Sequence, residues 1–462
     1  MSLVEAILFG SLEDVKRLVQ AGADIEEIDE YGFSPLIEAA IANKLAVADL
    51  LLQSGAAVDS TDATGRTALH WAVDNQNIPL CQLLLSHHAD PNAYTHSSQP
   101  LLIYPILRQQ IALKNLLYQH GAQLSFAQDF IQAKLLGHRY ELTGEVDIVN
   151  SKAAFIPVEY EGFFLEFTLD IVRYSLARYR RHFIARDFRA YFPYLDQAIQ
   201  AFQVASELLR YQRYTIDIDQ MAARIDPLLS QPLLLLPIAY EGHAISFVKY
   251  QRWLARCDRG ENSKREGSVV IYELKDSARW TLSFVKQLLY QQQSEAFITQ
   301  GIQAFLGLKK VMQLPLAAQL IGNCSWANIE ASLPTLLFLL LMEAGHSKVT
   351  LQACQAQALL IHQDWLQWDK ERALEECLKS FPYASRARKA TKATLLGAVL
   401  FQTCQYQRAD DLEKAIKLLP ILTLPDYQYV LRSYLKVYWQ DKKTPQGRNL
   451  TQFLDDYGVK LT

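Results

Sequence analysis

Residues 62–70 read Asp-Ala-Thr-Gly-Arg-Thr-Ala-Leu-His, and residues 29–36 carry the related string Asp-Glu-Tyr-Gly-Phe-Ser-Pro-Leu, in the same register 33 positions earlier. A second marker, Gly-Ala-Asp at 22–24, returns in related form every 33 residues, at 55–57, 88–90 and 121–123. This fixed period predicts a solenoid of stacked supersecondary units. Packing explains each residue type, because Ser/Thr-Pro-Leu opens a short helix, small residues let two helices approach, and glycine ends the second helix.

The repeat resembles the ankyrin repeat. Residues 1–28 supply only a helix pair, as a terminal capping unit does. The fourth unit, about 95–127, is degenerate, because Pro100 and Pro105 fall where its first helix is expected to begin and continue, and so shorten or distort that helix. The resemblance implies an ankyrin domain of four units at 1–127.

Ankyrin arrays present an extended concave face, so the resemblance implies a partner protein bound through the repeats. An array that only stabilises the fold is the alternative. Exposed-type aromatic, amide and charged residues in the turns and inner helices are expected to touch the partner: Tyr31, Phe33, Arg66, Trp71, Asp74 and Asn75.

Composition restricts the other functional classes. The 462 residues suggest about three domains, and 46 Lys and Arg against 49 Asp and Glu give a net charge of −3. A chain with this net charge does not attract nucleic acid by its overall electrostatic field. The basic run at 178–182 is interpreted as a solvated helix face, so direct nucleic-acid binding is disfavoured.

The six cysteines form no C-x-x-C pair, so neither a metal nor a cofactor is expected. The N-terminus has no Sec-type signal pattern. The longest uncharged apolar run, 331–342, is shorter than the roughly 18 residues that a membrane span needs, and it is interpreted as a buried helix.

Apolar periodicity predicts a multidomain, mainly α-helical chain with a small β-sheet. A helical segment at 128–232 leads into an α+β core at 233–380, and a helical region follows at 381–462. Within the core, short apolar runs between 233 and 274 predict three or four strands. Helical spacing resumes beyond 277.

Candidate catalytic residues lie in the α+β core. If the hairpin turn centres on Tyr250-Gln251, His243 pairs directly with Asp258, and the carboxylate then fixes the imidazole tautomer. Cys324 stands at the start of a long apolar helix, where the helix dipole and a nearby imidazolium lower a thiol pKa. Gln319 has an amide donor that can reach an oxyanion. Each residue taken alone is more often structural, and only the combination favours catalysis.

The order His243, Asp258, Gln319, Cys324 resembles the cysteine proteases of clan CE. The strings Gly-His-Ala-Ile-Ser, Cys-Asp-Arg-Gly and Gly-Asn-Cys-Ser-Trp are similar to a pattern of Legionella effectors, and the whole chain resembles the ankyrin-repeat effectors of that group. The resemblance implies Cys324 as nucleophile, His243 as base, Asp258 as third member and Gln319 as oxyanion donor. Two positions depart: Asp258 stands where the effectors have Asn, and Ser325 stands where the clan has Gly.

Three functions follow from these resemblances and stay open at this point. The first is an effector that binds a host protein and hydrolyses a peptide or isopeptide bond in it. The second is a non-catalytic scaffold with a protease-like fold, and the third is acyl transfer of the YopJ type. The resemblance also implies type IV secretion into the host cytosol or nucleus. Nothing in the sequence specifies the host target or the oligomeric state.

Overall fold

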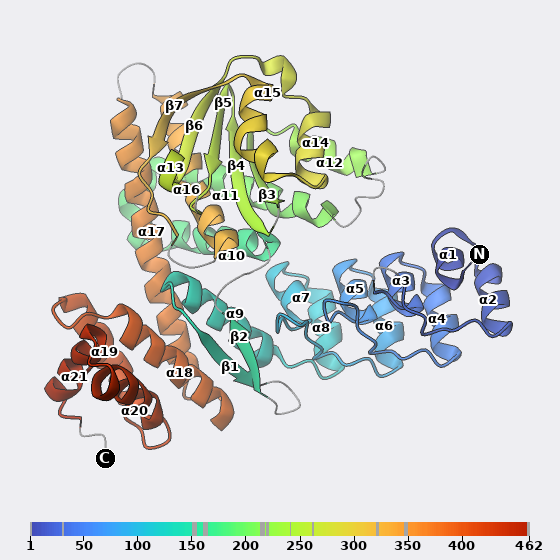
Figure 1. Cartoon of the computed structure of the whole chain (residues 1–462), viewed down its shortest axis with the longest axis horizontal. Helices are drawn as coiled ribbons and strands as arrows, with labels where there is room; N and C mark the ends of the chain where they lie inside the picture. Colours follow the sequence, from blue (N-terminus) through green and yellow to red (C-terminus); the bar gives the residue numbers. More distant parts are fainter. Residues whose placement is uncertain are drawn as a thin grey trace. The chain divides into compact units, whose positions relative to one another are not determined.

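The computed structural model describes residues 2–29, 32–149, 155–159, 165–212, 218, 221–240, 242–260, 263–319, 323–345 and 350–459, with only the backbone described at 145–149 and 155–159. The chain forms two compact units. The first comprises Met1–Leu135, Gly144–Glu159 and Ser380–Thr462, and the second comprises Leu136–Thr143 and Tyr160–Lys379. Figure 1 labels their elements.

The ankyrin array begins the first unit with paired short helices. Ser34 and Thr67 sit at the N-caps of the first helices of two successive repeats, and Ser34 accepts a hydrogen bond from the N–H of Ile37. The turn after each second helix needs a left-handed residue, which Gly55 supplies at φ 96° and His88 at φ 66°. The helices are α1 (Leu3–Phe9), α2 (Leu12–Gln20), α3 (Pro35–Ile41), α4 (Leu45–Gln53), α5 (Ala68–Asp74), α6 (Ile78–Ser86), α7 (Ile103–Leu107) and α8 (Ile111–Gln119).

The fourth repeat has the shortened first helix that its prolines predict. Helix α7 has 5 residues, whereas α3 and α5 have 7 each. Its second helix, α8, has 9 residues, the same length as α4 and α6. Helices α7 and α8 lie where the degenerate fourth unit is expected, and the assignment of 95–127 as an ankyrin unit stays a prediction.

The first unit also contains a hairpin and the C-terminal helices. The carboxylate of Asp129 on α9 forms ion pairs with Arg388 at 3.2 Å and with Lys392 at 3.0 Å, both on α18. The hairpin is a β element that the sequence analysis did not single out within the helical segment expected at 128–232. The elements are α9 (Leu124–Arg139), β1 (Glu145–Val149), β2 (Phe155–Glu159), α18 (Arg386–Thr403), α19 (Ala409–Leu422), α20 (Gln428–Leu435), η5 (Lys436–Asp441) and α21 (Pro445–Asp456).

A five-stranded antiparallel sheet of order β3-β4-β5-β6-β7 forms the centre of the second unit. Four strands match the predicted runs. The fifth, β7, corrects the expectation that only helices follow residue 277. Its strand character is hidden in the sequence because the residues between its two buried ends are mostly exposed. The strands are β3 (Leu233–Tyr240), β4 (His243–Tyr250), β5 (Trp253–Cys257), β6 (Val269–Leu274) and β7 (Leu308–Leu314).

Helices cover both faces of this sheet (Figure 1). Alternate residues of each strand face one core or the other, so Leu235 packs with one helix layer and Leu236 with the opposite layer. The first layer is α10 (Leu165–Arg181), α11 (Phe192–Arg210), α16 (Cys324–Ala344) and α17 (Leu351–Ser380). The second is α12 (Ala222–Leu229), α14 (Leu282–Tyr290) and α15 (Ile302–Leu306). Short elements complete the unit: η1 (Phe183–Tyr191), α13 (Ser263–Glu266), η3 (Ser277–Arg279) and η4 (Phe297–Gly301).

Helix α16 contains the longest apolar run. Within the described part of the chain it is the one helix long and apolar enough to cross a membrane, and 89% of its 18-residue window is buried inside the protein. The apolar side chains of α16 are therefore used in packing against the sheet and the neighbouring helices.

The hairpin of β4 and β5 has a different register from the predicted one. Tyr250 pairs with Trp253 and Ser246 with Cys257, so the turn centres on Gln251-Arg252. Extended by three residues beyond the Ser246–Cys257 pair, this register sets His243 opposite Gly260 and not opposite Asp258. Because the shift is an even number of residues, His243 and Asp258 still share one face of the sheet. The turn follows from the left-handed Gln251, at φ 49°, which no Asn-Gly signal marks.

Candidate catalytic site

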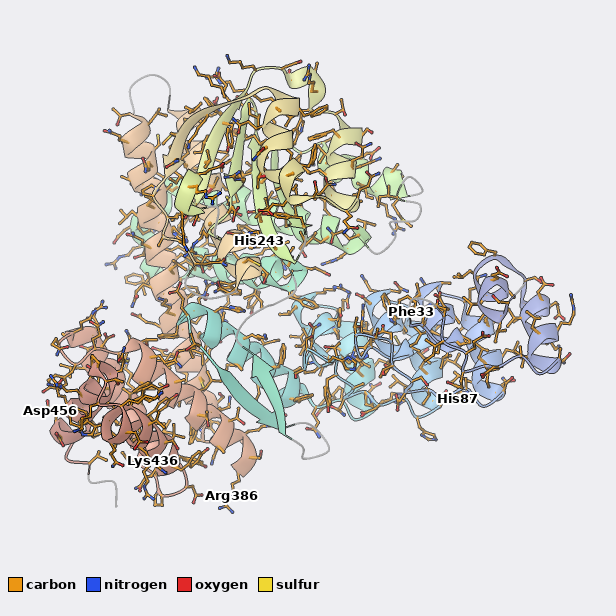
Figure 2. All side chains as sticks on the ribbon, viewed as in Figure 1. Phe33, His87, His243, Arg386, Lys436 and Asp456 are labelled. Atoms are coloured by element: carbon orange, nitrogen blue, oxygen red, sulfur yellow. The ribbon has the colours of Figure 1, made fainter. Side chains whose placement is uncertain are left out.

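Three element ends bring a histidine, an aspartate and a cysteine together in the second unit. His243 begins β4, Asp258 follows the last residue of β5, and Cys324 begins α16. Strands β4 and β5 are neighbours and α16 packs against both, which places the three ends side by side. Nε2 of His243 lies 3.1 Å from Oδ1 of Asp258, and Figure 2 labels the histidine on its strand.

The imidazole of His243 is held between two acidic groups. Its hydrogen bond with Asp258, and then its hydrogen bond with Cys324, raise the pKa of His243 to about 9 against the opposing effect of burial. Because Nε2 faces the carboxylate, Nδ1 is the ring nitrogen left for the sulfur. The site therefore favours a charged imidazolium at neutral pH.

The thiol of Cys324 has the opposite shift. Burial raises its pKa, but hydrogen bonds from His243 and from the N–H groups of Ala244 and Ser325 outweigh burial and leave the pKa below its usual value. A lowered thiol pKa beside a raised imidazole pKa is the electrostatic signature of a thiolate–imidazolium pair.

Asp258 is a buried carboxylate with 1% of its surface exposed. Burial raises its pKa, but the hydrogen bond with His243, the N–H of Gly260 and the charge of Arg256 together lower the pKa below its usual value. The N–H of Gly260 donates to Oδ1 over 3.1 Å, the same oxygen that faces His243. An ionised Asp258 thus fixes the orientation of the ring and stabilises its positive charge.

Cys324 differs from the other five cysteines in both access and electrostatics. It is partly exposed, whereas the others are buried. Burial raises the pKa of Cys81 to about 12, and that of Cys257 and of Cys404 to about 11. Cys257 also lies within the core of the sheet, as its position next to Asp258 on a strand predicts.

Gln319 lies in the segment that approaches the site from β7. Its N–H donates to the carbonyl of Arg259 over 2.9 Å, one residue after Asp258. Its side-chain Oε1 is buried and has no hydrogen-bond partner among the described residues. Residues 320–322, which join Gln319 to the helix of Cys324, lie outside the described residues. The oxyanion role of Gln319 therefore stays a prediction.

The structure also shows site residues that the sequence analysis missed. Gly260 lies against the imidazole of His243, and the N–H of Ala244 faces the sulfur of Cys324. Asn328 lies one helical turn after Cys324 and is fully buried. A polar residue at i+4 from the cysteine on an apolar helix is the sequence signal that points to Asn328. Among the described residues, no group of three or more His, Cys, Asp or Glu side chains is placed to hold a metal ion.

The ankyrin residues predicted to touch a partner divide into two groups, and Tyr31 lies outside the described residues. Phe33 contacts Trp71 edge to face with ring centroids 5.9 Å apart, and the guanidinium of Arg66 lies 3.9 Å from the centroid of the Trp71 ring. These three partly buried side chains form one cluster.

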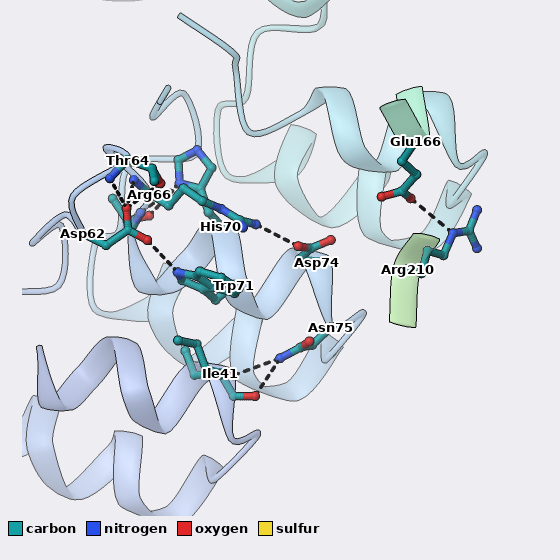
Figure 3. A network of polar contacts seen from close by, with 12 residues as sticks. Ile41, Asp62, Thr64, Arg66, His70, Trp71, Asp74, Asn75, Glu166 and Arg210 are labelled. Atoms are coloured by element: carbon teal, nitrogen blue, oxygen red, sulfur yellow. Dashed lines mark hydrogen bonds and ion pairs between the residues drawn. The ribbon is translucent and has the colours of Figure 1, made fainter. Parts of the chain in front are cut away.

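Asp74 and Asn75 use their polar groups inside the array (Figure 3). The carboxylate of Asp74 is completely buried and forms ion pairs with Arg66 at 2.8 Å and with Arg108 at 2.7 Å. The amide of Asn75 donates to the carbonyls of Ala40 and Ile41 in the preceding repeat, each over 3.1 Å. Both residues therefore connect neighbouring repeats.

The fold and this site define an ankyrin-repeat protein whose α+β unit brings a cysteine, a histidine and an aspartate together. An ankyrin-repeat family model matches residues 3–95 in three copies. The solved structure of the Legionella effector AnkH is 44% identical, covers 100% of this chain and 98% of its own, and superposes with a TM-score of 0.91. The chain therefore belongs to the family of the Legionella effector AnkH. The curated proteins contain no match to this chain.

Proposed function

We propose that this protein is a bacterial effector that binds a host protein through its ankyrin repeats and cleaves a peptide or isopeptide bond in it with Cys324, His243 and Asp258. Membership of the AnkH family supports the effector role and delivery into a host cell. The ankyrin array supports the binding role. One arrangement carries the catalytic part: Nε2 of His243 lies 3.1 Å from Oδ1 of the buried Asp258, and the same imidazole hydrogen-bonds to Cys324 at the start of α16.

In the proposed first half-reaction, the Cys324 thiolate attacks the substrate carbonyl carbon and a C–S bond forms. The carbonyl π electrons move to oxygen, and the backbone N–H of Cys324 and the amide of Gln319 stabilise this oxyanion. The His243 imidazolium gives its proton to the leaving nitrogen as the C–N bond breaks. The products of this step are a free amine and a thioester on Cys324.

In the second half-reaction, neutral His243 takes a proton from water as the water oxygen attacks the thioester carbon. The C–S bond breaks, the acid product leaves, and the sulfur departs as the thiolate that pairs with His243. Asp258 stays ionised and stabilises the imidazolium at both stages. Its lowered pKa and its hydrogen bond to Nε2 support this role.

The cluster of Phe33, Arg66 and Trp71 is the proposed contact surface for the host protein. Aromatic and arginine side chains dominate binding energy at protein interfaces. Tyr31 belongs to the same proposal by its sequence position. Asp74 and Asn75 contribute by holding adjacent repeats in place, which the ion pairs and carbonyl contacts support.

A vinyl-sulfone probe tests the hydrolase proposal. The full-length chain is incubated with a ubiquitin-like and with a peptide vinyl sulfone, and mass spectrometry locates the adduct. We expect one thioether at Cys324, none in Cys324→Ala, and unchanged labelling in the matched control Cys354→Ala, whose cysteine is buried. Absence of an adduct with both probes, while iodoacetamide still modifies Cys324, would contradict hydrolysis of these substrates.

A non-catalytic scaffold is the second candidate. The buried Ser325, at the position after the nucleophile where clan CE proteases have glycine, favours it. Capture of the same host protein with the same cellular effect by Cys324→Ala would establish the scaffold. YopJ-type acyl transfer is the third candidate, and it differs from hydrolysis in its acceptor. The protein is incubated with an acetyl thioester and a substrate protein. Transfer of the acetyl group to a lysine of that protein, and not to water, would identify acyl transfer.

A further inference from the structure

Asn328 connects the strands of the site to the helix of the cysteine. It is completely buried on α16, one helical turn after Cys324. Its Nδ2 donates to the carbonyl of Ala244 over 2.6 Å, and its Oδ1 accepts from the N–H of Arg259 over 2.6 Å. Ala244 directly follows His243, and Arg259 directly follows Asp258. The side-chain amide of Asn328 therefore holds the main chain next to His243 and next to Asp258. It does so from α16, the helix that begins with Cys324.

The end of the β4–β5 pairing explains why this amide is needed. Strand β5 stops pairing with β4 at Ser246, so the edge of β4 at Ala244 has no strand partner on that side. Helix α16 supplies the missing partners. The N–H of Ala244 faces the sulfur of Cys324, and its carbonyl accepts from Asn328. A shift of this strand end thus moves both the imidazole of His243 and the N–H that stabilises the thiolate.

The chemistry of the two contacts selects asparagine. The carbonyl of Ala244 requires a donor and the N–H of Arg259 requires an acceptor, and the asparagine side chain offers one of each in a single plane. A carboxylate at this position keeps the acceptor but places an oxygen against the Ala244 carbonyl. An aliphatic side chain leaves both main-chain groups buried without a partner.

We infer that Asn328 is a positioning residue that keeps His243 and Asp258 in register with the sulfur of Cys324. It acts on the thiol through Ala244 and through the imidazole of His243. Its importance for turnover rests on the proposed function, whereas its effect on the thiol pKa does not.

The pH profile of Cys324 alkylation tests the inference. Iodoacetamide labelling of the full-length chain, read by mass spectrometry, gives the midpoint at which the thiol ionises. Asn328→Asp is expected to raise this midpoint by about one pH unit and to lower the labelling rate below the midpoint about tenfold. Asn328→Ser, which leaves room for a water molecule to bond both main-chain groups, is expected to raise the midpoint less.

Two control variants separate positioning from general destabilisation. Asn449 of the other unit also bridges two main-chain groups, with Nδ2 on the carbonyl of Cys404 at 2.8 Å and Oδ1 on the N–H of Tyr406 at 2.7 Å. Asn449→Asp should lower the melting temperature without moving the midpoint. Thr335→Val, closer to the C-terminal end of α16, removes the buried contact between the Thr335 hydroxyl and the sulfur of Cys257, which are 3.4 Å apart. This substitution should leave the midpoint of Cys324 ionisation unchanged.

The outcomes distinguish this inference from the proposed hydrolysis. A midpoint that is unchanged in Asn328→Asp and in Asn328→Ser overturns the positioning role, whether or not the vinyl-sulfone probes react. A raised midpoint in a protein that reacts with neither probe supports the positioning role and removes the hydrolase proposal. If Asn328→Asp does not fold, the midpoint of Asn328→Ser decides.

Discussion

Gly260 lies so close to His243 that the Cβ of an alanine at this position would be 2.7 Å from Cε1 of the imidazole and 3.0 Å from its Nε2. The same glycine donates its N–H to Asp258, so its backbone holds the carboxylate and its missing side chain leaves room for the ring. The glycine is therefore required for space at the point where the histidine and the aspartate meet.

Gly260→Ala is expected to displace the ring of His243 and break its contact with Asp258. Loss of that contact lowers the imidazole pKa, and the alkylation rate of Cys324 at neutral pH then falls about tenfold. Labelling rates by mass spectrometry measure this. In the double variant with His243→Ala the two closest contacts of the added methyl are removed and only Asp258 Oδ1, at 3.2 Å, remains, so the substitution at 260 should cost much less further stability. Equal stability loss in both backgrounds would show that the backbone, and not the ring, resists the methyl group.

Cys324 is expected to react fastest of the six thiols with iodoacetamide near neutral pH. Its pKa is lowered and the residue is partly exposed, whereas burial raises the pKa of Cys81, Cys257 and Cys404. His243→Ala removes the imidazolium and should slow the labelling several-fold. Partial alkylation of the native protein followed by mass spectrometry gives the order of reaction. Labelling of Cys324 that is indifferent to His243 would contradict an activated thiol.

The free energy of unfolding should depend on pH through His243. A raised pKa means that the folded protein holds the imidazole proton more tightly than the unfolded chain does. This contribution is complete below about pH 6.5, the usual histidine pKa, and is lost as the pH rises through about 9. The stability difference between the wild-type chain and His243→Gln should therefore shrink across that window. Denaturant titrations at four pH values measure this dependence.

Glu38 of the ankyrin array should destabilise the repeats as the pH rises. Burial, and then a hydrogen bond and the charge of Asp29, raise the pKa of Glu38 to about 7. The stabilising effect of its proton is complete below about pH 4.5 and is lost as the pH rises through about 7. Glu38→Gln should then protect the α3 amides from hydrogen exchange more at pH 8 than the wild-type chain does, and equally at pH 4.5. The exposed Glu13→Gln is the matched control.

Asp74→Ala should destabilise the array strongly, by about 3–5 kcal/mol, because it leaves two largely buried guanidiniums without their carboxylate. Asp49→Ala, which removes only a surface contact with Gln53, should cost less than about 1 kcal/mol. Chemical denaturation monitored by hydrogen exchange of the repeat peptides measures both. Similar values for the two variants would show that the Arg66 and Arg108 contacts contribute little to stability.

The ankyrin array could be predicted from the sequence because its pattern repeats along the chain. Features that depend on one contact between distant residues could not be predicted. The ankyrin array was visible because each unit buries the same residue types 33 positions apart. Strand β7 was hidden because its exposed Lys309 and Lys310 break the alternation that marks a half-buried strand. Lysines at an exposed sheet edge are typical of protection against unwanted pairing.

At the site, residue types were predictable and their geometry was not. The residue types of His243, Asp258 and Cys324 were enough to choose them as candidates. The predicted hairpin register was wrong by two residues, an even number, so His243 and Asp258 still share one face of the sheet. The direct pairing was wrong, because the turn depends on a left-handed Gln251. The position of Asn328 one helical turn after Cys324 can be read from the sequence, but its role cannot, because its partner carbonyl lies 84 residues away. Asp74 has the charge typical of a surface residue, and its burial is compensated by ion pairs with Arg66 and with Arg108 of the next repeat.

The division of the chain between its two units has a consequence for synthesis. Residues 160–379 complete one unit while the other still lacks α18 to α21, which follow at its C-terminal end. On the ribosome, the unit that holds Cys324 can therefore fold first, and Asp129 waits for Lys392 and Arg388 until translation is almost finished. A chain that terminates early near residue 380 would contain a folded thiol site, while the Asp129 carboxylate of α9 would lack both of its cations.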